Sequence, residues 1–334
     1  MPDRADDASQ QTLPWTPYKV RVGDLDIRVA QRPGGREGDT PLLLISGIGA
    51  HLDMWGPLER ALPGRGLVGF DAPGTGESDR PGRPMRMHGY ARVVRDLLDV
   101  LGYERADLLG VSFGGALAQE VARRHPERVR RLVLCATSAG FVGVPPRPVP
   151  ALFLMSPARY YHPALFRFML PRIVGGRTAR EPEALDAQLG PRLSNPPDPL
   201  GYAFQMFATM GWTSAHWLHR LPHRTLVIAG EDDRAIPLPN AKLLASRIPD
   251  ARLHVVRDGG HVFVLDEPES VGDVIEAFLE EPELRAFAGK RSGPAPRGAP
   301  RRAAPRRDVV GHGDARPRLG GGRRCETAIR ARRP

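Results

Sequence analysis

Short apolar segments recur along the first 140 residues and predict the strands of a β-sheet. Alternating apolar and polar residues at 18–22 and 25–30 flank Gly23-Asp24 and predict a β-hairpin. The run at 41–45 is continuously apolar, as in a strand buried on both faces. Further strands are predicted at 66–70, 106–109 and 129–136.

Amphipathic segments separate these strands. Helices are predicted where apolar residues recur every three to four positions, at 88–102, 116–122, 238–248 and 267–279. Two more strands are predicted, each before one of the last two helices, at 225–229 and 253–256. Strands that alternate with helices indicate a mostly parallel sheet covered by helices on both faces. We therefore expect an α/β fold.

The pattern changes between residues 140 and 223, where strand signals vanish, prolines are dense and aromatic residues gather. An insertion of this length is too long for a structureless loop. We expect a helical cap over the carboxyl ends of the strands, where such sheets bind ligands. The expected core is then 16–139 and 224–282, with the cap at 140–223 between its two parts.

Both ends of the chain differ from this body. Residues 1–15 have no apolar pattern and are expected to be disordered. From Arg285 onward the chain carries 15 of the 48 basic residues but only 3 of the 38 acidic residues, which leaves 33 basic and 35 acidic residues before it. Because 285–334 is rich in Arg, Pro, Gly and Ala, we expect a disordered basic tail. The nearly neutral body is not expected to bind nucleic acid.

Composition narrows the class of protein further. No apolar run approaches the roughly 20 residues that a membrane-spanning helix needs, and the N-terminus lacks the apolar segment of a signal peptide. Two cysteines, Cys135 and Cys325, form no disulfide framework and favour a cytoplasmic location. No Cys/His cluster has the spacing of metal ligands, so neither a metal nor another cofactor is expected.

The segment Gly110-Val111-Ser112-Phe113-Gly114-Gly115 carries the strongest chemical signal. It lies between a predicted strand and a predicted helix and matches Gly-x-Ser-x-Gly, the turn known as a nucleophile elbow. In such a turn the serine has strained backbone angles, and small flanking residues let strand and helix approach closely. Ser112 is therefore the predicted nucleophile.

A serine hydroxyl needs a base, and the base needs a carboxylate that orients it. His261 follows the last predicted strand in the glycine-containing loop Asp258-Gly259-Gly260-His261 and is the candidate base. The loop after the preceding strand, Gly230 to Pro237, offers three acids. Among them Asp233 is the preferred partner and Asp232 the alternative. The order Ser, Asp, His along the chain matches one known arrangement of these groups.

An oxyanion formed by attack of Ser112 would need two fixed N–H donors. The backbone N–H of Phe113 directly follows the nucleophile and is one candidate. The other is expected in the turn Gly47-Ile48-Gly49, most plausibly at Ile48, since glycine on both sides lets the backbone face a pocket.

The whole pattern over residues 18–280 resembles the α/β-hydrolase fold family. More specific segments resemble intracellular depolymerases of medium-chain-length poly(3-hydroxyalkanoates). These segments are 44–55, 110–119, 136–140, 156–161, 211–214 and 217–218. The resemblance implies an eight-stranded, mostly parallel sheet with a cap inserted after strand 6. It also implies that Ser112, Asp233 and His261 form a catalytic triad.

The implied activity is hydrolysis of a hydrophobic polyester through an acyl-enzyme, without a cofactor, in the cytoplasm, with polymer granules as a candidate partner. Most cap aromatics are expected to pack the cap's own core, but Trp55, Phe113, Met169 and Trp212 are candidate pocket residues. Alternatives on the same fold are a general carboxylesterase or lipase, a carbon–carbon bond hydrolase and an acyltransferase. An alternative of another class is a non-catalytic binding protein.

Overall fold

The computed structural model describes residues 16–35, 39–145, 148–155 and 157–282. The segments predicted to be disordered, 1–15 and 285–334, lie outside the described residues. The described residues belong to one compact unit, which contains both the sheet and the helices inserted into it.

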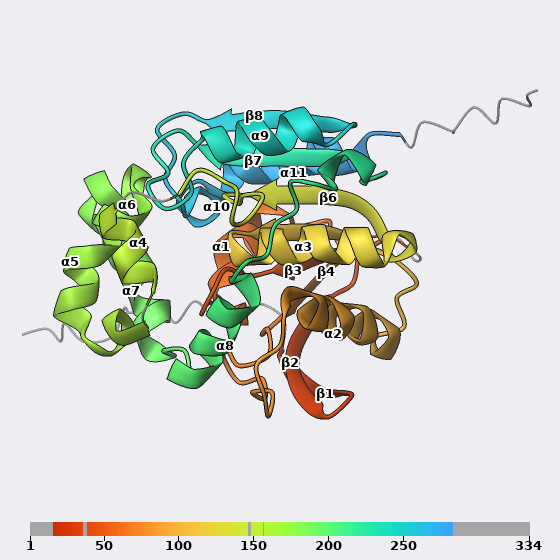
Figure 1. Ribbon diagram of the computed structural model, residues 1–334, viewed down its shortest axis with the longest axis horizontal. Coiled ribbons are helices and arrows are strands. Elements are labelled where there is room, and N and C mark those ends of the chain that lie inside the picture. Colours follow the sequence, from red (N-terminus) through yellow and green to blue (C-terminus); the bar gives the residue numbers. More distant parts are fainter. Residues whose placement is uncertain (1–15, 36–38, 146–147, 156, 283–334) are drawn as a thin grey trace, which may run out of the picture. The chain divides into compact units, whose positions relative to one another are not determined.

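Eight strands of the described chain form one sheet in the order β1-β2-β4-β3-β5-β6-β7-β8 (Figure 1). They are β1 Tyr18–Val22, β2 Leu25–Arg32, β3 Leu42–Ile45, β4 Leu67–Phe70, β5 Ala106–Val111, β6 Val129–Cys135, β7 Thr225–Gly230 and β8 Ala251–Val256. Strand β2 pairs antiparallel with β1 and β4, and every other pair is parallel. The predicted hairpin and the mostly parallel eight-stranded sheet are therefore confirmed.

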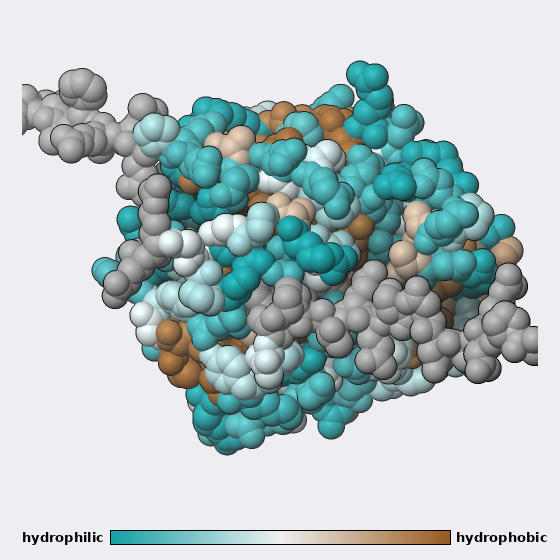
Figure 2. Space-filling model, turned by 180° about the vertical axis from the view of Figure 1, so that it is seen from behind, coloured by the Kyte–Doolittle hydropathy of each residue, from teal (hydrophilic) through white to brown (hydrophobic). Residues whose placement is uncertain are grey.

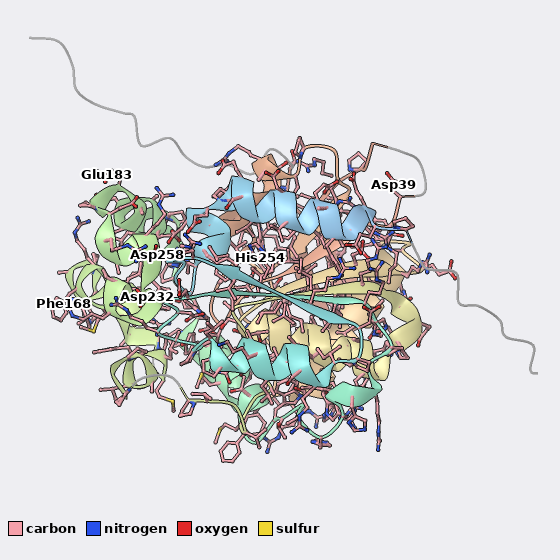
Figure 3. The ribbon with its side chains drawn as sticks, turned by 90° about the horizontal axis from the view of Figure 1, so that it is seen from above. Asp39, Phe168, Glu183, Asp232, His254 and Asp258 are labelled. Carbon is pink, nitrogen blue, oxygen red and sulfur yellow. The ribbon has the colours of Figure 1, made fainter. Side chains whose placement is uncertain are left out.

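Helices cover both faces of this sheet. One face packs against α2, α3 and α9, which span Met87–Val100, Phe113–Arg124 and Pro239–Arg247. The other face packs against α1, α10 and α11, which span Gly56–Ala61, Phe263–Asp266 and Pro268–Glu280. Seen from above, α11 and α9 lie on opposite sides of the strands (Figure 3).

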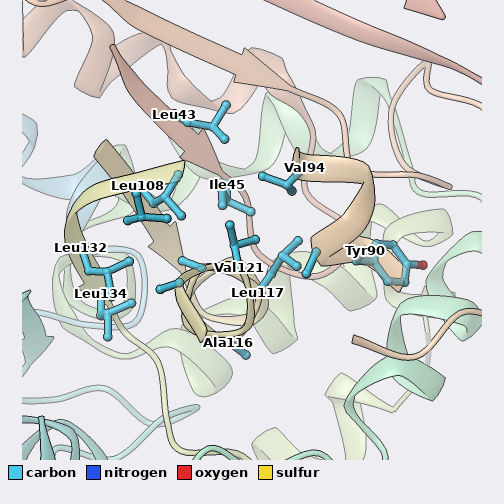
Figure 4. Close-up of a cluster of buried hydrophobic side chains, with 14 of the residues drawn as sticks. Leu43, Ile45, Tyr90, Val94, Leu108, Ala116, Leu117, Val121, Leu132 and Leu134 are labelled. Atoms are coloured by element: carbon cyan, nitrogen blue, oxygen red, sulfur yellow. The ribbon is translucent and has the colours of Figure 1, made fainter. Parts of the chain in front are cut away.

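The strands divide their side chains between these two faces with a period of two. Leu43 and Ile45 point into the cluster with α2 and α3, whereas Leu42 and Leu44 join the cluster on the opposite face. Figure 4 shows the first cluster, with Leu43 and Ile45 facing the helices. All four side chains are fully buried, and full burial of each is worth roughly 1.5–3 kcal/mol. This explains why the strand at 42–45 is apolar throughout.

Five helices lie between β6 and β7, where a cap was predicted. They are α4 Pro148–Leu154, α5 Pro163–Val174, α6 Gly176–Arg180, α7 Pro182–Ser194 and α8 Pro199–Thr209. Four of the five begin with proline, whose fixed φ and missing N–H suit the first turn of a helix. Some of the dense prolines of this segment therefore mark where helices begin, whereas Pro171 and Pro191 lie inside α5 and α7. Helices α4 to α7 gather at one end of the sheet (Figure 1).

Candidate active site

Ser112 lies in the turn between β5 and α3 with φ 56° and ψ −115°. Such a backbone is costly for a residue other than glycine and persists only where the surroundings hold it. The flanking glycines explain how the turn closes. A Cβ at Gly110 would lie 2.3 Å from the carbonyl oxygen of Gly114, and a Cβ at Gly114 would lie 2.0 Å from that of Ile45.

Hydrogen bonds from β6 and the loop after it hold this turn. The backbone N–H of Ser112 donates to the Cys135 carbonyl at 2.9 Å, and the Thr137 hydroxyl donates to the Ser112 carbonyl at 2.7 Å. Both polar groups of the Ser112 backbone are therefore bonded.

His261 and Asp233 come from loops after β8 and β7 and form a direct pair. The Nδ1 atom of His261 lies 2.8 Å from Oδ2 of Asp233. The other carboxylate oxygen of Asp233 accepts the backbone N–H groups of Ala235 and Ile236, at 2.9 and 2.8 Å. The Asp233 side chain is fully buried. With Nδ1 donating to the carboxylate, Nε2 of the neutral ring is left as an acceptor.

The alternative acid, Asp232, points elsewhere. Its carboxylate accepts hydrogen bonds from Arg234 and from the backbone N–H of Gly176. Burial acts to raise the pKa of Asp232, but these hydrogen bonds and the nearby arginine charges hold it below its ordinary value. Figure 3 shows Asp232 where the loops at the sheet edge meet the cap. Of the two aspartates, Asp233 is therefore the one that contacts His261.

Ser112 and His261 line the same cavity, which opens between the sheet and the cap. Most of its wall is apolar. The apolar residues include some from the turn after β3, from the 3-10 helix Leu52–Trp55 before α1, and from α4 and α5. Examples are Ile48, Trp55, Leu154, Phe166, Leu170 and Ile173. The cavity can thus hold an apolar group beside a hydroxyl and an imidazole.

The two predicted oxyanion donors lie in turns next to the nucleophile. Phe113 begins α3, and Gly47 approaches so closely that a Cβ there would lie 3.5 Å from Cβ of Ser112. The side chain of Gln205 in α8 accepts the N–H of Gly49 at 2.9 Å and so holds the Gly47–Gly49 turn. Within the described part of the chain, the N–H groups of Ile48 and Phe113 have no acceptor.

Two predicted pocket residues need correction. Trp212 lies in a different pocket, beside α3, where its Nε1 donates to Glu120 at 3.0 Å. The reason is a close approach at Gly140, where a Cβ would lie 2.3 Å from the Trp212 carbonyl oxygen. Met169 is buried in the cap's own hydrophobic cluster and is not among the residues that line the cavity.

The other two predicted pocket residues, Trp55 and Phe113, differ in where their side chains lie. Trp55 lines the cavity, and its Nε1 donates to the Ser46 hydroxyl at 2.8 Å. The ring of Phe113 instead packs edge-on against Tyr90 in α2, with centroids 5.7 Å apart. Only its backbone can therefore serve the site.

The cap also holds the histidine loop in place, which the sequence did not reveal. The backbone N–H of His261 donates to the Val174 carbonyl at 2.6 Å. Gly175 and Gly176 have positive φ and lie against the acid and histidine loops, where a Cβ would come within 2.0 Å of Asp232 and 2.2 Å of Gly260. No side chain fits between the end of α5 and these loops, so cap and base are mechanically linked.

Sequence reasoning also missed two cap arginines that line the cavity, Arg159 and Arg192. For Arg192, the spacing of inward-facing residues along α7 was a signal that could have revealed its position. Arg192 continues the inward-facing stripe of α7 formed by Leu185 and Leu189, where an apolar residue is expected.

Residues 40–268 match the family profile described as the alpha/beta hydrolase fold. This stretch is more than half of the chain, and together with the sheet order and the elbow it shows that the protein belongs to the α/β-hydrolase fold family and is a hydrolase. The chain is 44% identical over 279 residues to a poly(3-hydroxyalkanoate) depolymerase of Ectopseudomonas oleovorans, covering 82% of this chain and 97% of that protein.

Other relatives share the fold. The chain is 34% identical over 259 residues to a 2-hydroxymuconate semialdehyde hydrolase of Pseudomonas putida, covering 72% of this chain and 87% of that one. Among solved structures, the enol-lactonase of Burkholderia xenovorans LB400 is similar with a TM-score of 0.68 and 25% identity, covering 79% of this chain and all of that one.

The described residues contain no helix that is both long and apolar enough to cross a membrane. Among the same residues, His, Cys, Asp and Glu side chains nowhere gather in groups of three or more that could hold a metal ion.

Proposed function

We propose that the protein is a serine hydrolase of carboxylic esters that acts as an intracellular depolymerase on medium-chain-length poly(3-hydroxyalkanoate). The observation that carries the proposal is the cavity, which brings a strained elbow serine and an aspartate-bound histidine to one apolar wall. The 44% identity to a poly(3-hydroxyalkanoate) depolymerase supports the choice of substrate.

In the proposed reaction, Ser112 Oγ attacks the ester carbonyl while Nε2 of His261 accepts the hydroxyl proton. Asp233 stabilises the imidazolium that forms. The N–H groups of Phe113 and Ile48 hold the oxyanion, and each such donor lowers the barrier by roughly 3 kcal/mol. Collapse breaks the bond to the ester oxygen, which leaves as an alcohol with the proton from His261. A water deprotonated by His261 then releases the acid and regenerates Ser112.

The surface of the cap supports contact with an apolar polymer. Six large hydrophobic side chains of the cap are more than half exposed, namely Phe141, Val142, Leu152, Met155, Phe168 and Met210. Phe168 lies at the outer edge of the cap in Figure 3. The face of the molecule in Figure 2 is mostly hydrophilic, with smaller apolar patches. We propose that exposed apolar side chains of the cap contact cytoplasmic polymer granules.

A fluorophosphonate probe tests the nucleophile, because it labels only an activated serine. We expect labelling of wild-type protein at Ser112, none of Ser112→Ala, and normal labelling of Ser246→Ala, a matched change at an exposed serine of α9. Hydrolysis of p-nitrophenyl octanoate should follow the same order. Full activity of Ser112→Ala would exclude the proposed nucleophile, and an unlabelled wild-type protein would favour a non-catalytic binding role.

Mass spectrometry of released products tests the substrate. Incubation with medium-chain polymer should release 3-hydroxy acids or their short oligomers, and short-chain polymer should release fewer. Hydrolysis of p-nitrophenyl octanoate with no release from either polymer would favour a general carboxylesterase. Turnover of a vinylogous dienoate would favour a carbon–carbon bond hydrolase, in line with the 34% identical relative. Capture of the acyl group by a thiol or alcohol in preference to water would favour an acyltransferase.

A further inference from the structure

Two arginine side chains line the otherwise largely apolar cavity beside Ser112 and His261. Arg159 lies in the short 3-10 helix Pro157–Tyr161 and is 5% exposed, and Arg192 lies in α7 and is 8% exposed. Burying a guanidinium group is costly unless an anion and hydrogen bonds compensate it. Such a group in the wall of a pocket therefore calls for an explanation.

The partners of Arg192 leave part of its guanidinium group free. Its Nη1 donates to the carbonyl and the side-chain oxygen of Gln188, the former at 2.8 Å. Gln188 in turn donates to Asp266 at 2.9 Å, so the nearest acid reaches Arg192 only through this amide. In the described chain, no carboxylate pairs directly with Arg192, and its Nη2 and Nε have no acceptor.

Arg159 is held more fully. It donates to the Phe153 carbonyl at 2.6 Å, and its Nη2 lies 3.2 and 3.3 Å from the hydroxyls of Tyr160 and Tyr202. Burial lowers the pKa of Arg192 below its ordinary value, and the charge of Arg159 acts in the same direction, while Tyr160 and Asp266 act to raise this pKa. Two like charges are thus held near one another at a cavity wall, an arrangement that an incoming anion would stabilise.

Guanidinium groups bind carboxylates through two parallel hydrogen bonds, and the open Nη2 and Nε edge of Arg192 has that geometry. We propose that Arg192, assisted by the charge of Arg159, binds a free carboxylate of the substrate beside the scissile ester. This inference rests on the proposed esterase function.

The consequence concerns where a polyester chain is cut. In the carboxyl-terminal unit of a poly(3-hydroxyalkanoate), the ester oxygen is attached two carbons from the carboxylate carbon. Ester and carboxylate therefore fit one cavity. Ser112 attacks the carbonyl of the preceding unit, the acyl–oxygen bond breaks, and the terminal unit leaves as a 3-hydroxy acid with the proton from His261. The enzyme thus removes units from carboxyl chain ends rather than cutting at random.

A pair of soluble substrates tests this directly. The 3-hydroxyoctanoate dimer with a free carboxylate should be hydrolysed with a kcat/KM at least tenfold above that of its methyl ester, since a hydrogen-bonded charge pair is worth about tenfold to a hundredfold. Arg192→Met should reduce this ratio to about one, and Arg192→Lys should lie between. Arg167→Met, a matched change at a half-exposed arginine of α5, should keep the wild-type ratio.

Calorimetry with the product separates this proposal from the proposed function, because it needs no turnover. Wild-type protein should bind 3-hydroxyoctanoate at least tenfold more tightly than the uncharged octane-1,3-diol, even if polymer proves not to be the substrate. Arg192→Met should remove that preference and Arg167→Met should retain it. Equal affinities in the wild type, or a preference unchanged in a folded Arg192→Met, would overturn the carboxylate site. If Arg192→Met does not fold, two other results test the carboxylate site. They are the preference of the wild-type protein for 3-hydroxyoctanoate and the weakening of that preference in Arg192→Lys.

Discussion

The sheet with its covering helices differs from the helical cap in how it places apolar and charged residues. In the sheet, side chains such as Leu43 and Leu44 are completely buried on its two faces. In the cap, Phe141 and Leu152 are 81% and 69% exposed while Arg192 is 8% exposed. Charged side chains are also buried in the core, but there the buried Asp107 pairs directly with Arg130, whereas no carboxylate of the described chain pairs directly with Arg192.

This difference corresponds to different proposed roles for the core and the cap. The core supplies the predicted nucleophile, acid and base from the ends of β5, β7 and β8, where packing tolerates little change. The cap supplies part of the cavity wall, including both of its arginines, and carries exposed apolar side chains, and so is suited to choosing the substrate. The two regions meet where Val174 accepts the N–H of His261.

The largest effect is expected in the core, from Asp233→Asn. Loss of the carboxylate should allow the wrong tautomer of His261 and lower kcat for p-nitrophenyl octanoate by about 10⁴-fold. The matched change Asp232→Asn should lower kcat by less than about tenfold, because Asp232 contacts Arg234 and the cap rather than His261. The reverse order of the two variants would assign the acid to Asp232.

The next largest effect is expected on the free energy of unfolding, because close packing should make a substitution in the core more destabilising than one in the cap. Gly114→Ala places a Cβ 2.0 Å from the Ile45 carbonyl oxygen and should lower the free energy of unfolding by about 3 kcal/mol or more. Gly190→Ala in α7 meets no atom within 4 Å and should raise it by about 0.5–1 kcal/mol. Urea unfolding of both variants measures this. Similar destabilisation by the two changes would contradict the contrast between core and cap.

The exposed face of the cap should affect polymer more than small esters. The double variant Leu152→Ser, Phe168→Ser removes two apolar side chains that are 69% and 54% exposed. We expect the ratio of polymer turnover to p-nitrophenyl octanoate turnover to fall severalfold, since each lost apolar contact weakens surface binding modestly. The matched control Val100→Ser alters an exposed apolar residue of α2, outside the cap, and should keep the ratio. An unchanged ratio in the double variant would place granule contact elsewhere.

The smallest effect concerns His223, a buried ionisable group at the boundary between the cap and the core. Burial lowers the pKa of His223, although a hydrogen bond to the Pro126 carbonyl opposes this. The unfolded chain therefore binds a proton near pH 6.5 before the folded chain does. The stability contributed by neutral His223 is present above pH 6.5 and is lost as the pH falls below it, by at most about 1.4 kcal/mol per pH unit.

Replacing His223 tests this dependence. His223→Gln should flatten the decline in the free energy of unfolding between pH 6.5 and 5, measured by urea unfolding. His219→Gln, at an exposed position nearby, should leave the decline as in the wild type. An equal decline in His223→Gln would assign the acid sensitivity to other groups.

Local patterns predicted much of the core because its physical causes are local. Continuous apolar runs such as 42–45 follow from burial on both faces, and the Gly-x-Ser-x-Gly spacing follows from contacts within one turn. The short helices α1 and α10 were missed because six and four residues are too few to establish a helical period. In the cap, the predictions of Trp212 and Met169 as pocket residues were wrong, since composition does not show which side chains face the cavity.

The amino-acid sequence by itself determined the α/β architecture, the family and the residues predicted to act, because hydrophobic period and turn chemistry are written in neighbouring positions. Only the tertiary structure decided that Asp233 rather than Asp232 meets His261, that Trp212 faces α3, and that Arg192 opens into the cavity. These outcomes depend on contacts between segments far apart in the chain, such as Gly140 against Trp212 and His51 against Pro191 of α7. No local pattern specifies such distances.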